Sequence, residues 1–166
     1  VEVRQGSGLK VLSPGEADCI AIAGMGASTI ISILEDDMEV AQSAELLVLQ
    51  PMAGAASLRA WLCSHGWQLA AEELVDDAPH FYEIIAAKRG SAPAYSAAEC
   101  AVGPLLLTQE HPLLGKQLER QLATCRQLLE NMGRSERARA SEKYKETEAL
   151  KAELEVLQNG KRSDSK

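Results

Sequence analysis

The sequence of 166 residues lacks long hydrophobic runs, a leader segment and closely spaced metal ligands. No apolar stretch approaches the roughly 18 residues of a membrane-spanning helix, which excludes an integral membrane protein. The first residues, Val1-Glu2-Val3-Arg4-Gln5, have neither the basic start nor the apolar centre of a signal peptide. Because the first residue is Val rather than Met, we expect the chain to begin inside a longer protein.

Cysteine is scarce, and the spacing of the four cysteines does not suit a metal site. They are Cys19, Cys63, Cys100 and Cys125. No CxxC motif and no His/Cys pair has the spacing of zinc ligands, so we predict that the protein holds no metal. Because nothing marks the chain as secreted, reduced thiols in a cytoplasmic protein are favoured over disulfides.

The net charge of −7 is unevenly distributed along the chain. Residues 1–110 carry five Lys or Arg against fifteen Asp or Glu, whereas residues 111–166 carry twelve against nine. An acidic body with a basic C-terminal arm raises nucleic-acid binding as a hypothesis. The alternative is a solvated helix of mixed charge, and charge alone favours that alternative.

Short apolar runs in the first half predict an α/β fold. Residues 19–23 and 46–49 are apolar without alternation, which fits strands buried on both faces of a parallel sheet. The apolar spacing over residues 28–34 predicts a helix that crosses between these strands. Residues 1–4 are a further candidate strand.

The next segments predict a helix and a β-hairpin. Leu58, Trp61, Leu62 and His65 recur at i, i+3, i+4 and i+7, with Ser57 as a candidate N-cap and Gly66 as the end. Residues 68–75 and 81–88 read as two strands around a turn-prone segment. This order of elements is typical of the second half of a doubly wound sheet with an antiparallel edge.

The C-terminal part predicts helices alone. Apolar residues step by 4, 3, 4 and 3 from Leu118 to Met132, and residues 136–157 read as a second helix. Two helices with a short joint suggest an antiparallel hairpin with coiled-coil packing, through which the protein could self-associate. We expect residues 160–166 to be a disordered tail.

Three predicted strands each end in a turn with glycine or polar residues. These turns are Gly6-Ser7-Gly8-Leu9, Ala23-Gly24-Met25-Gly26 and Gln50-Pro51-Met52. Ligands bind at the C-terminal ends of strands in open α/β sheets, and glycines let a ligand come close to the backbone. Each motif alone also fits a tight strand-to-helix turn, but their convergence on one edge favours a ligand site.

The motifs, taken in their order, resemble those of one family. They are Val3-Arg4-Gln5-Gly6-Ser7-Gly8-Leu9, Ile20-Ala21-Ile22-Ala23-Gly24-Met25-Gly26, Ile33-Leu34, Leu49-Gln50-Pro51, Leu58-Arg59, Trp61-Leu62, His65-Gly66-Trp67, Phe81-Tyr82-Glu83 and Gly103-Pro104-Leu105-Leu106. With the helical tail, they resemble the bacterial TrmK-type tRNA adenine-N1 methyltransferases over about residues 1–157. That family uses S-adenosylmethionine to methylate N1 of adenine 22 in tRNA.

The resemblance implies a Rossmann-like methyltransferase core followed by a helical coiled-coil hairpin. It implies that the cofactor is bound by Gly6, Ser7, Gly8, Leu9, Ala23, Gly24 and Met25. It places Gly24, Met25, Gln50 and Pro51 at the catalytic centre, with Met52 at the substrate base. Tyr82 is a further candidate to stack on the base, although an ordinary strand residue of the hairpin is the favoured alternative for it. With the resemblance, contact with the tRNA backbone becomes the favoured role of Arg134, Arg137, Arg139, Lys143 and Lys145.

The chain also departs from the family pattern. Ser7, Ala27 and Met52 stand where the family usually has Asp, Gly and Asn. The first two strands of such a core, with the loop for the methionine part of the cofactor, have no counterpart in this sequence. We therefore expect residues 1–107 to be the C-terminal part of the core and residues 108–159 the hairpin, and we expect this chain alone to be inactive.

Two other functions stay open at this point. A methyltransferase-like scaffold could bind RNA without transferring methyl groups, which the residues at positions 7, 27 and 52 favour. Alternatively, the helical hairpin could pair with another chain and use the α/β part as a platform.

Overall fold

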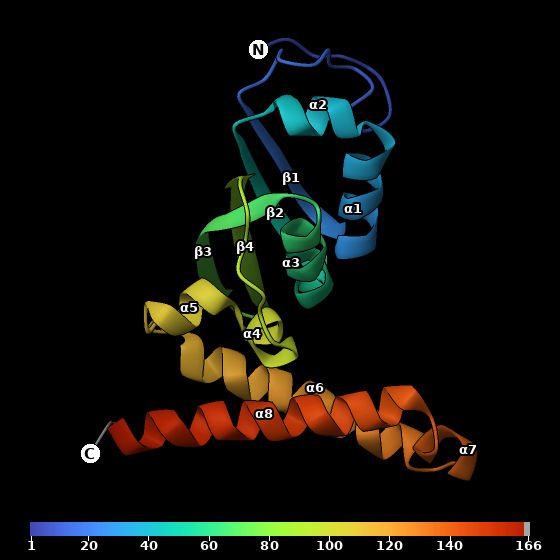
Figure 1. Cartoon of the computed structure of the whole chain (residues 1–166), viewed down its shortest axis with the longest axis vertical. Helices are drawn as coiled ribbons and strands as arrows, with labels where there is room; N and C mark the ends of the chain where they lie inside the picture. Colours follow the sequence, from blue (N-terminus) through green and yellow to red (C-terminus); the bar gives the residue numbers. More distant parts are fainter. Residues whose placement is uncertain (165–166) are drawn as a thin grey trace. The chain divides into compact units, whose positions relative to one another are not determined.

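The computed structural model describes the backbone of residues 1–164 and the side chains of residues 1–160. The chain divides into two compact units, Val1–Tyr95 and Ser96–Lys166. The first unit contains a four-stranded sheet with helices, and the described elements of the second unit are all helices (Figure 1). Among the described residues, no helix combines the length and the apolar character that crossing a membrane requires.

The sheet of the first unit is mixed. Its strands are β1 (Cys19–Gly26), β2 (Leu46–Ala53), β3 (Trp67–Asp77) and β4 (His80–Arg89). Their order is β1-β2-β4-β3, with β1 parallel to β2 and with β4 antiparallel to both of its neighbours. This arrangement confirms the predicted α/β fold with an antiparallel hairpin at its edge.

Three helices belong to this unit. They are α1 (Ala27–Asp36), α2 (Met38–Ser43) and α3 (Ala55–Ser64). The apolar spacing predicted α1 and α3, and their side chains Ile30, Leu34, Leu58 and Leu62 are fully buried. The short helix α2 has no counterpart in the prediction.

The start of α3 differs from the expected one. The helix begins at Ala55 after the N-cap Gly54, so Ser57 lies inside the first turn. The Ser57 hydroxyl donates to the Gly54 carbonyl at 2.7 Å, and it therefore does not accept from a helix N–H as an N-cap would.

Two strand predictions need correction. Residues 1–4 form no strand, and Val1 and Val3 are exposed. A strand needs a neighbour for its N–H and C=O groups, and residues 1–4 have none in the sheet. The expectation that β1 is buried on both faces was also wrong, because Ile20 and Ile22 are buried while Cys19, Ala21 and Ala23 are exposed.

The second unit consists of five helices in the described part of the chain. They are α4 (Ala97–Val102), α5 (Pro104–Thr108), α6 (Leu114–Met132), α7 (Glu136–Arg139) and α8 (Glu142–Asp164). Helix α4 packs on α6 and α8, and the buried Gln117 donates from Nε2 to the Val102 carbonyl at 3.4 Å. The unit therefore begins at Ser96, earlier than the expected boundary between residues 107 and 108.

Helices α6 and α8 lie side by side, with α7 at the turn between them (Figure 1). Leu118, Leu122 and Cys125 of α6 and Leu154 of α8 are buried, as their spacing predicted. The helix expected over residues 136–157 is interrupted between α7 and α8, where the Ser141 hydroxyl accepts from Tyr144 N–H at 3.2 Å. Helix α8 continues to Asp164 into the expected tail, and residues 165–166 lie outside the described residues.

Candidate functional site

The ends of β1 and β2 meet at the carboxyl edge of the sheet. In the parallel register, Ala23 lies opposite Gln50 and Met25 opposite Pro51. The register of β4 on β2 pairs Leu49 with Ile85, so Tyr82 lies at this same end of the sheet. The structure thus brings together the residues that the resemblance assigns to the catalytic centre and the base.

A bulge interrupts β1 at Gly24. The pairing with β2 shifts between Ala23 and Met25 and again before Gly26. Gly24 has φ +77°, a conformation that L side chains rarely adopt, and nothing lies within 4 Å of the position of a Cβ atom there. A ligand can therefore approach the Gly24 backbone closely, and the next side chain, Met25, is 41% exposed.

The Gln50 side chain stabilises this bulge. Gly24 N–H donates to Gln50 Oε1 at 2.8 Å, which satisfies a group that the bulge removes from the strand ladder. The Gln50 Nε2 atom lies 3.5 Å from the Met52 sulfur, which is a weak acceptor. Met52 itself is 55% exposed.

A cavity of about 420 Å³ lies beside β1 and is lined by consecutive residues of this strand, Cys19 to Ile22. Of the residues predicted to bind the cofactor, Gly8, Leu9 and Met25 line this cavity, together with Ile33 and Cys19. Gly8 has φ +57°, and a Cβ atom there would lie 3.3 Å from the Ile33 side chain. The side chains that line it are apolar and suit the faces of a flat aromatic ring, while backbone groups add polar surface.

Four predicted cofactor residues do not line this cavity. Gly6 packs against Val11, where a Cβ atom would clash with the Val11 side chain. Ser7 is exposed, and its carbonyl accepts from Lys10 N–H at 3.2 Å. Ala23 and Gly24 lie beside the cavity on β1 and are exposed.

The sequence prediction missed a buried charge network beneath the site. Arg59 of α3 is 0% exposed, with Nε 2.5 Å from Glu72 Oε1 of β3 and Nη2 2.9 Å from Glu83 Oε2 of β4. Arg59 and Glu83 stood in the motifs that carried the resemblance, but without a role. The network joins α3, which directly follows the loop after Met52, to both strands of the hairpin.

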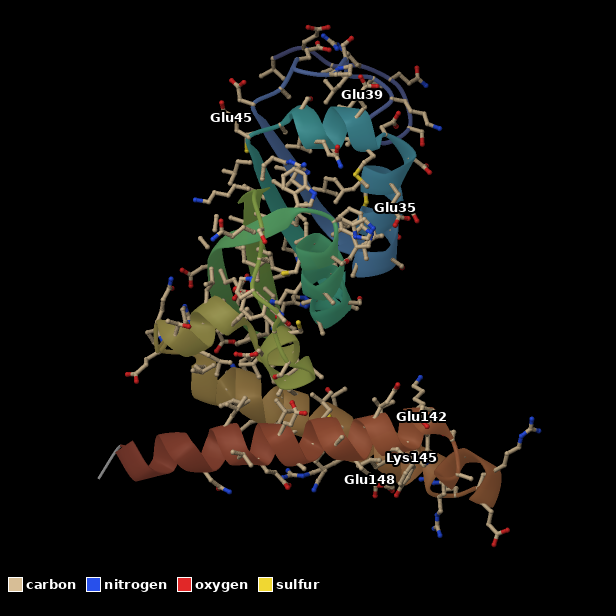
Figure 2. All side chains as sticks on the ribbon, in the orientation of Figure 1. Glu35, Glu39, Glu45, Glu142, Lys145 and Glu148 are labelled. Atoms are coloured by element: carbon tan, nitrogen blue, oxygen red, sulfur yellow. The ribbon has the colours of Figure 1, made fainter. Side chains whose placement is uncertain are left out.

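A second missed contact joins α1 to α3. Trp61 Nε1 donates to Glu35 Oε1 at 2.8 Å, and the Trp61 ring stacks on His65 with 4.4 Å between ring centroids. Glu35 is labelled on α1 in Figure 2. Neither contact reaches the strand ends, so both serve the packing of these helices.

The basic cluster gathers at the turn between α6 and α8, but its members differ in their partners. Arg139 Nε donates to the Gly133 carbonyl at 2.7 Å, Arg134 lies 3.5 Å from Glu130, and Lys145 lies 3.7 Å from Glu142. Lys145, Glu142 and Glu148 follow one another at the start of α8 (Figure 2). Among the described residues, the side chains of Arg137 and Lys143 have no partner.

Metal binding has no support in the described part of the chain, where no group of three or more His, Cys, Asp or Glu side chains is arranged to hold an ion. The four cysteines are free thiols, of which Cys100 and Cys125 are buried.

Comparison with known proteins identifies the family. The family model for TrmK, tRNA (adenine(22)-N(1))-methyltransferase, matches residues 1–159. The chain belongs to this family. The tRNA (adenine(22)-N(1))-methyltransferase of Bacillus subtilis is 32% identical over 162 residues, which are 95% of this chain and 67% of that protein.

Solved structures of similar proteins have the same fold. The B. subtilis m1A22 tRNA methyltransferase TrmK superposes with a TM-score of 0.74 at 29% identity, covering 95% of this chain and 68% of that one. A Streptococcus pneumoniae protein solved in complex with S-adenosyl-L-methionine has a TM-score of 0.76 at 28% identity, with the same coverage. A Streptococcus agalactiae protein of the NADB-Rossmann superfamily has a TM-score of 0.79 at 26% identity, covering 95% and 67%.

Proposed function

We propose that the protein transfers the methyl group of S-adenosylmethionine to N1 of an adenine in tRNA, adenine 22 in the nucleotide numbering of its family. The observation that carries the proposal is the family match over residues 1–159, joined to a ligand-accessible strand edge built from the family's motifs. The cytoplasm, where tRNA is modified in bacteria, is the proposed location.

The residues of β1 and the segment before it fit the adenosine part of the cofactor. The cavity along β1 is lined by apolar side chains, among them Leu9 and Met25, and by Gly8, and its volume of about 420 Å³ exceeds that of a purine ring. Ser7 stands where the family has an acidic residue, and its hydroxyl has no partner among the described residues. A hydroxyl can accept a hydrogen bond from an adenine amino group, although more weakly than a carboxylate.

The chemistry asks the chain for orientation rather than for acid or base catalysis. When bound, S-adenosylmethionine supplies an electrophilic methyl group on a sulfonium. Adenine N1 has a free lone pair, so the N1–C bond can form and the C–S bond can break without prior removal of a proton. The site must hold N1, the methyl carbon and the sulfur in line, which is catalysis by positioning.

The side chains around the bulge are suited to hold an adenine. Met25 and Met52 are exposed apolar groups at the strand ends, and Tyr82 lies at the same end of the sheet. A base that is stacked or paired in tRNA must leave the stack to reach this edge. Gly24 and Pro51 would lie under the face of the base, with Gln50 at its edge.

We further propose that the tip of the helical hairpin contacts the tRNA backbone. Arg137 and Lys143 carry charges that no described side chain offsets, so they are the principal phosphate ligands. Arg134 and Lys145 have acidic neighbours within 4 Å and add less, and Arg139 chiefly fixes the turn through the Gly133 carbonyl.

Gly24→Val tests the cofactor and base assignment. The side chain would project into the open space beside the bulge and would strain a residue with φ +77°. Gly15→Val is the matched control, because Gly15 has φ +78°, open space around it and an N–H bonded to a side-chain oxygen of Ser43.

In a chain that also contains the first two strands of the core, we expect Gly24→Val to abolish S-adenosylmethionine binding in calorimetry and methyl transfer to tRNA, whereas Gly15→Val retains both. Mapping of the product by mass spectrometry should find the methyl group on N1 of adenine. Full activity of Gly24→Val, or a methyl group on another atom, would refute the assignment.

A further inference from the structure

The Gln50 carboxamide has a single possible orientation at the strand edge. A side-chain amide presents an acceptor oxygen on one side and a donor NH2 group on the other. The Gly24 N–H can only donate, and it lies 2.8 Å from the Gln50 side chain. The oxygen must therefore face Gly24, and the NH2 group must face away from the β1 backbone.

The outward NH2 group is left with donor capacity. Its neighbour is the Met52 thioether at 3.5 Å, which is a long contact to a weak acceptor. The second N–H has no partner among the described residues. Because Gln50 is only partly buried, solvent and a ligand can both reach this donor.

The bulge and the amide fix each other. Gly24 lacks a partner in the ladder because the register shifts around it, and Gln50 Oε1 supplies that partner from the opposite strand. Pro51 follows Gln50 and is buried against Met25 in the register, which holds the backbone below the amide. A donor held in this way discriminates more strongly than a freely rotating side chain, because it cannot turn its oxygen to the ligand.

We propose that Gln50 determines specificity by donating a hydrogen bond from Nε2 to a ring nitrogen of the target adenine other than N1. The proposal rests on the proposed methyl transfer. Adenine N1 must stay free to react, and the exocyclic amino group is itself a donor, so N3 and N7 are the acceptors that remain on the base. Gln50 thus both positions the bulge through Oε1 and reads the base through Nε2.

Two substitutions separate these roles. Gln50→Glu keeps an oxygen for Gly24 N–H and removes the donor, since an ionised carboxylate only accepts. Gln50→Ala removes both groups. Gln42→Glu, at an exposed position of α2, introduces the same change of charge away from the site and is the matched control.

The first measurement is hydrogen exchange of the Gly24 amide by NMR in the unliganded protein. We expect slow exchange in the unaltered protein and in Gln50→Glu, and exchange about tenfold faster in Gln50→Ala, the effect of one hydrogen bond. Equal exchange in the unaltered protein and Gln50→Ala would overturn the amide orientation. This measurement needs no activity, so it stands if the proposed function fails.

The second measurement is kcat/KM for methyl transfer to tRNA that carries adenine, 3-deazaadenine or 7-deazaadenine at the target position. One of the two analogues should react about tenfold more slowly than adenine with the unaltered protein and with Gln42→Glu. With Gln50→Glu, kcat/KM for tRNA that carries adenine should fall by the same factor. For tRNA that carries the analogue, Gln50→Glu should leave kcat/KM unchanged.

The outcomes separate the two proposals. If Gln50→Glu still discriminates against the same analogue, or if the unaltered protein discriminates against neither, Gln50 does not read the base. If the unaltered protein, with the first two strands of the core present, methylates no adenine in tRNA, the proposed function fails, and with it the base-reading role.

Discussion

Replacing Arg59 with Met should destabilise the first unit strongly. The guanidinium is fully buried and pairs with Glu72, whose side chain is also fully buried, and with Glu83, whose side chain is 16% exposed. Without Arg59, the two carboxylates in or near the core lose the guanidinium with which they pair. Removal of one partner from a buried ion pair costs about 3–5 kcal/mol.

That cost is a large part of the stability of a small domain. Stabilities of about 5–15 kcal/mol are usual, so Arg59→Met should remove roughly a fifth or more of the total. For a unit of this size, each kcal/mol lowers Tm by about 4–8 °C, so we expect a decrease of at least ~12 °C. Urea denaturation followed by tryptophan fluorescence suits the measurement, because Trp67 of β3 is fully buried in the same unit.

Two further variants decide whether buried charge is the cause. Arg89→Met removes an exposed arginine that lies over the Trp67 ring at 5.1 Å, and it should cost at most about 1 kcal/mol. The triple variant with Arg59→Met, Glu72→Leu and Glu83→Gln removes the unpaired charges and should recover most of the loss. A loss below about 1 kcal/mol for Arg59→Met, or a triple variant no more stable than the single one, would refute the argument.

Three other results are expected. Met52→Asn gives Gln50 Nε2 a stronger acceptor and restores the residue usual in the family, so kcat/KM for methyl transfer should rise; no gain in a radiolabel assay would remove Met52 from the base site. Arg137→Glu should weaken tRNA binding in filter assays and reduce by about one the steepness with which the logarithm of the association constant falls with the logarithm of salt concentration. Arg126→Glu on α6 is the control and should change neither; equal effects of the two variants would remove Arg137 from the tRNA contact. Burial raises the pKa of the Cys125 thiol, so at pH 9 iodoacetamide should modify the exposed Cys19 faster than Cys125. Equal alkylation rates of the two thiols, measured by mass spectrometry, would contradict the burial of Cys125.

Local patterns predicted the elements well where neighbouring residues decide the structure. The hairpin of β3 and β4 followed from two apolar strands around a turn, and the buried stripe of α6 followed from its helical spacing. Residues 1–4 show the limit of such patterns. Val1 and Val3 favour a strand locally, but a strand is stable only when another strand satisfies its backbone.

The sequence predicted that these strand ends share one edge of the sheet, but it did not predict the contacts made there. The glycines around Met25 and the polar residues after Leu49 indicated a ligand edge, because the ends of parallel strands must meet. The bond from Gly24 to Gln50 depends on the register of β1 on β2, which no local pattern determines. A Gly-x-Gly pair at the end of a strand indicates a bulge. It could therefore have predicted a backbone N–H that needs a hydrogen-bond acceptor from outside the strand ladder.

Strand β1 shows why an apolar run can be misread. Its residues are apolar on both faces, and we interpreted that as burial on both faces by the protein itself. The structure buries Ile20 and Ile22 but leaves the small side chains of Cys19 and Ala21 lining the cavity with Gly8. Removing water from an apolar face lowers the free energy, whether the protein itself or a ligand covers that face. The same composition therefore suits a core and a pocket for a flat ring, and only the alternation of large with small side chains along β1 distinguishes the two.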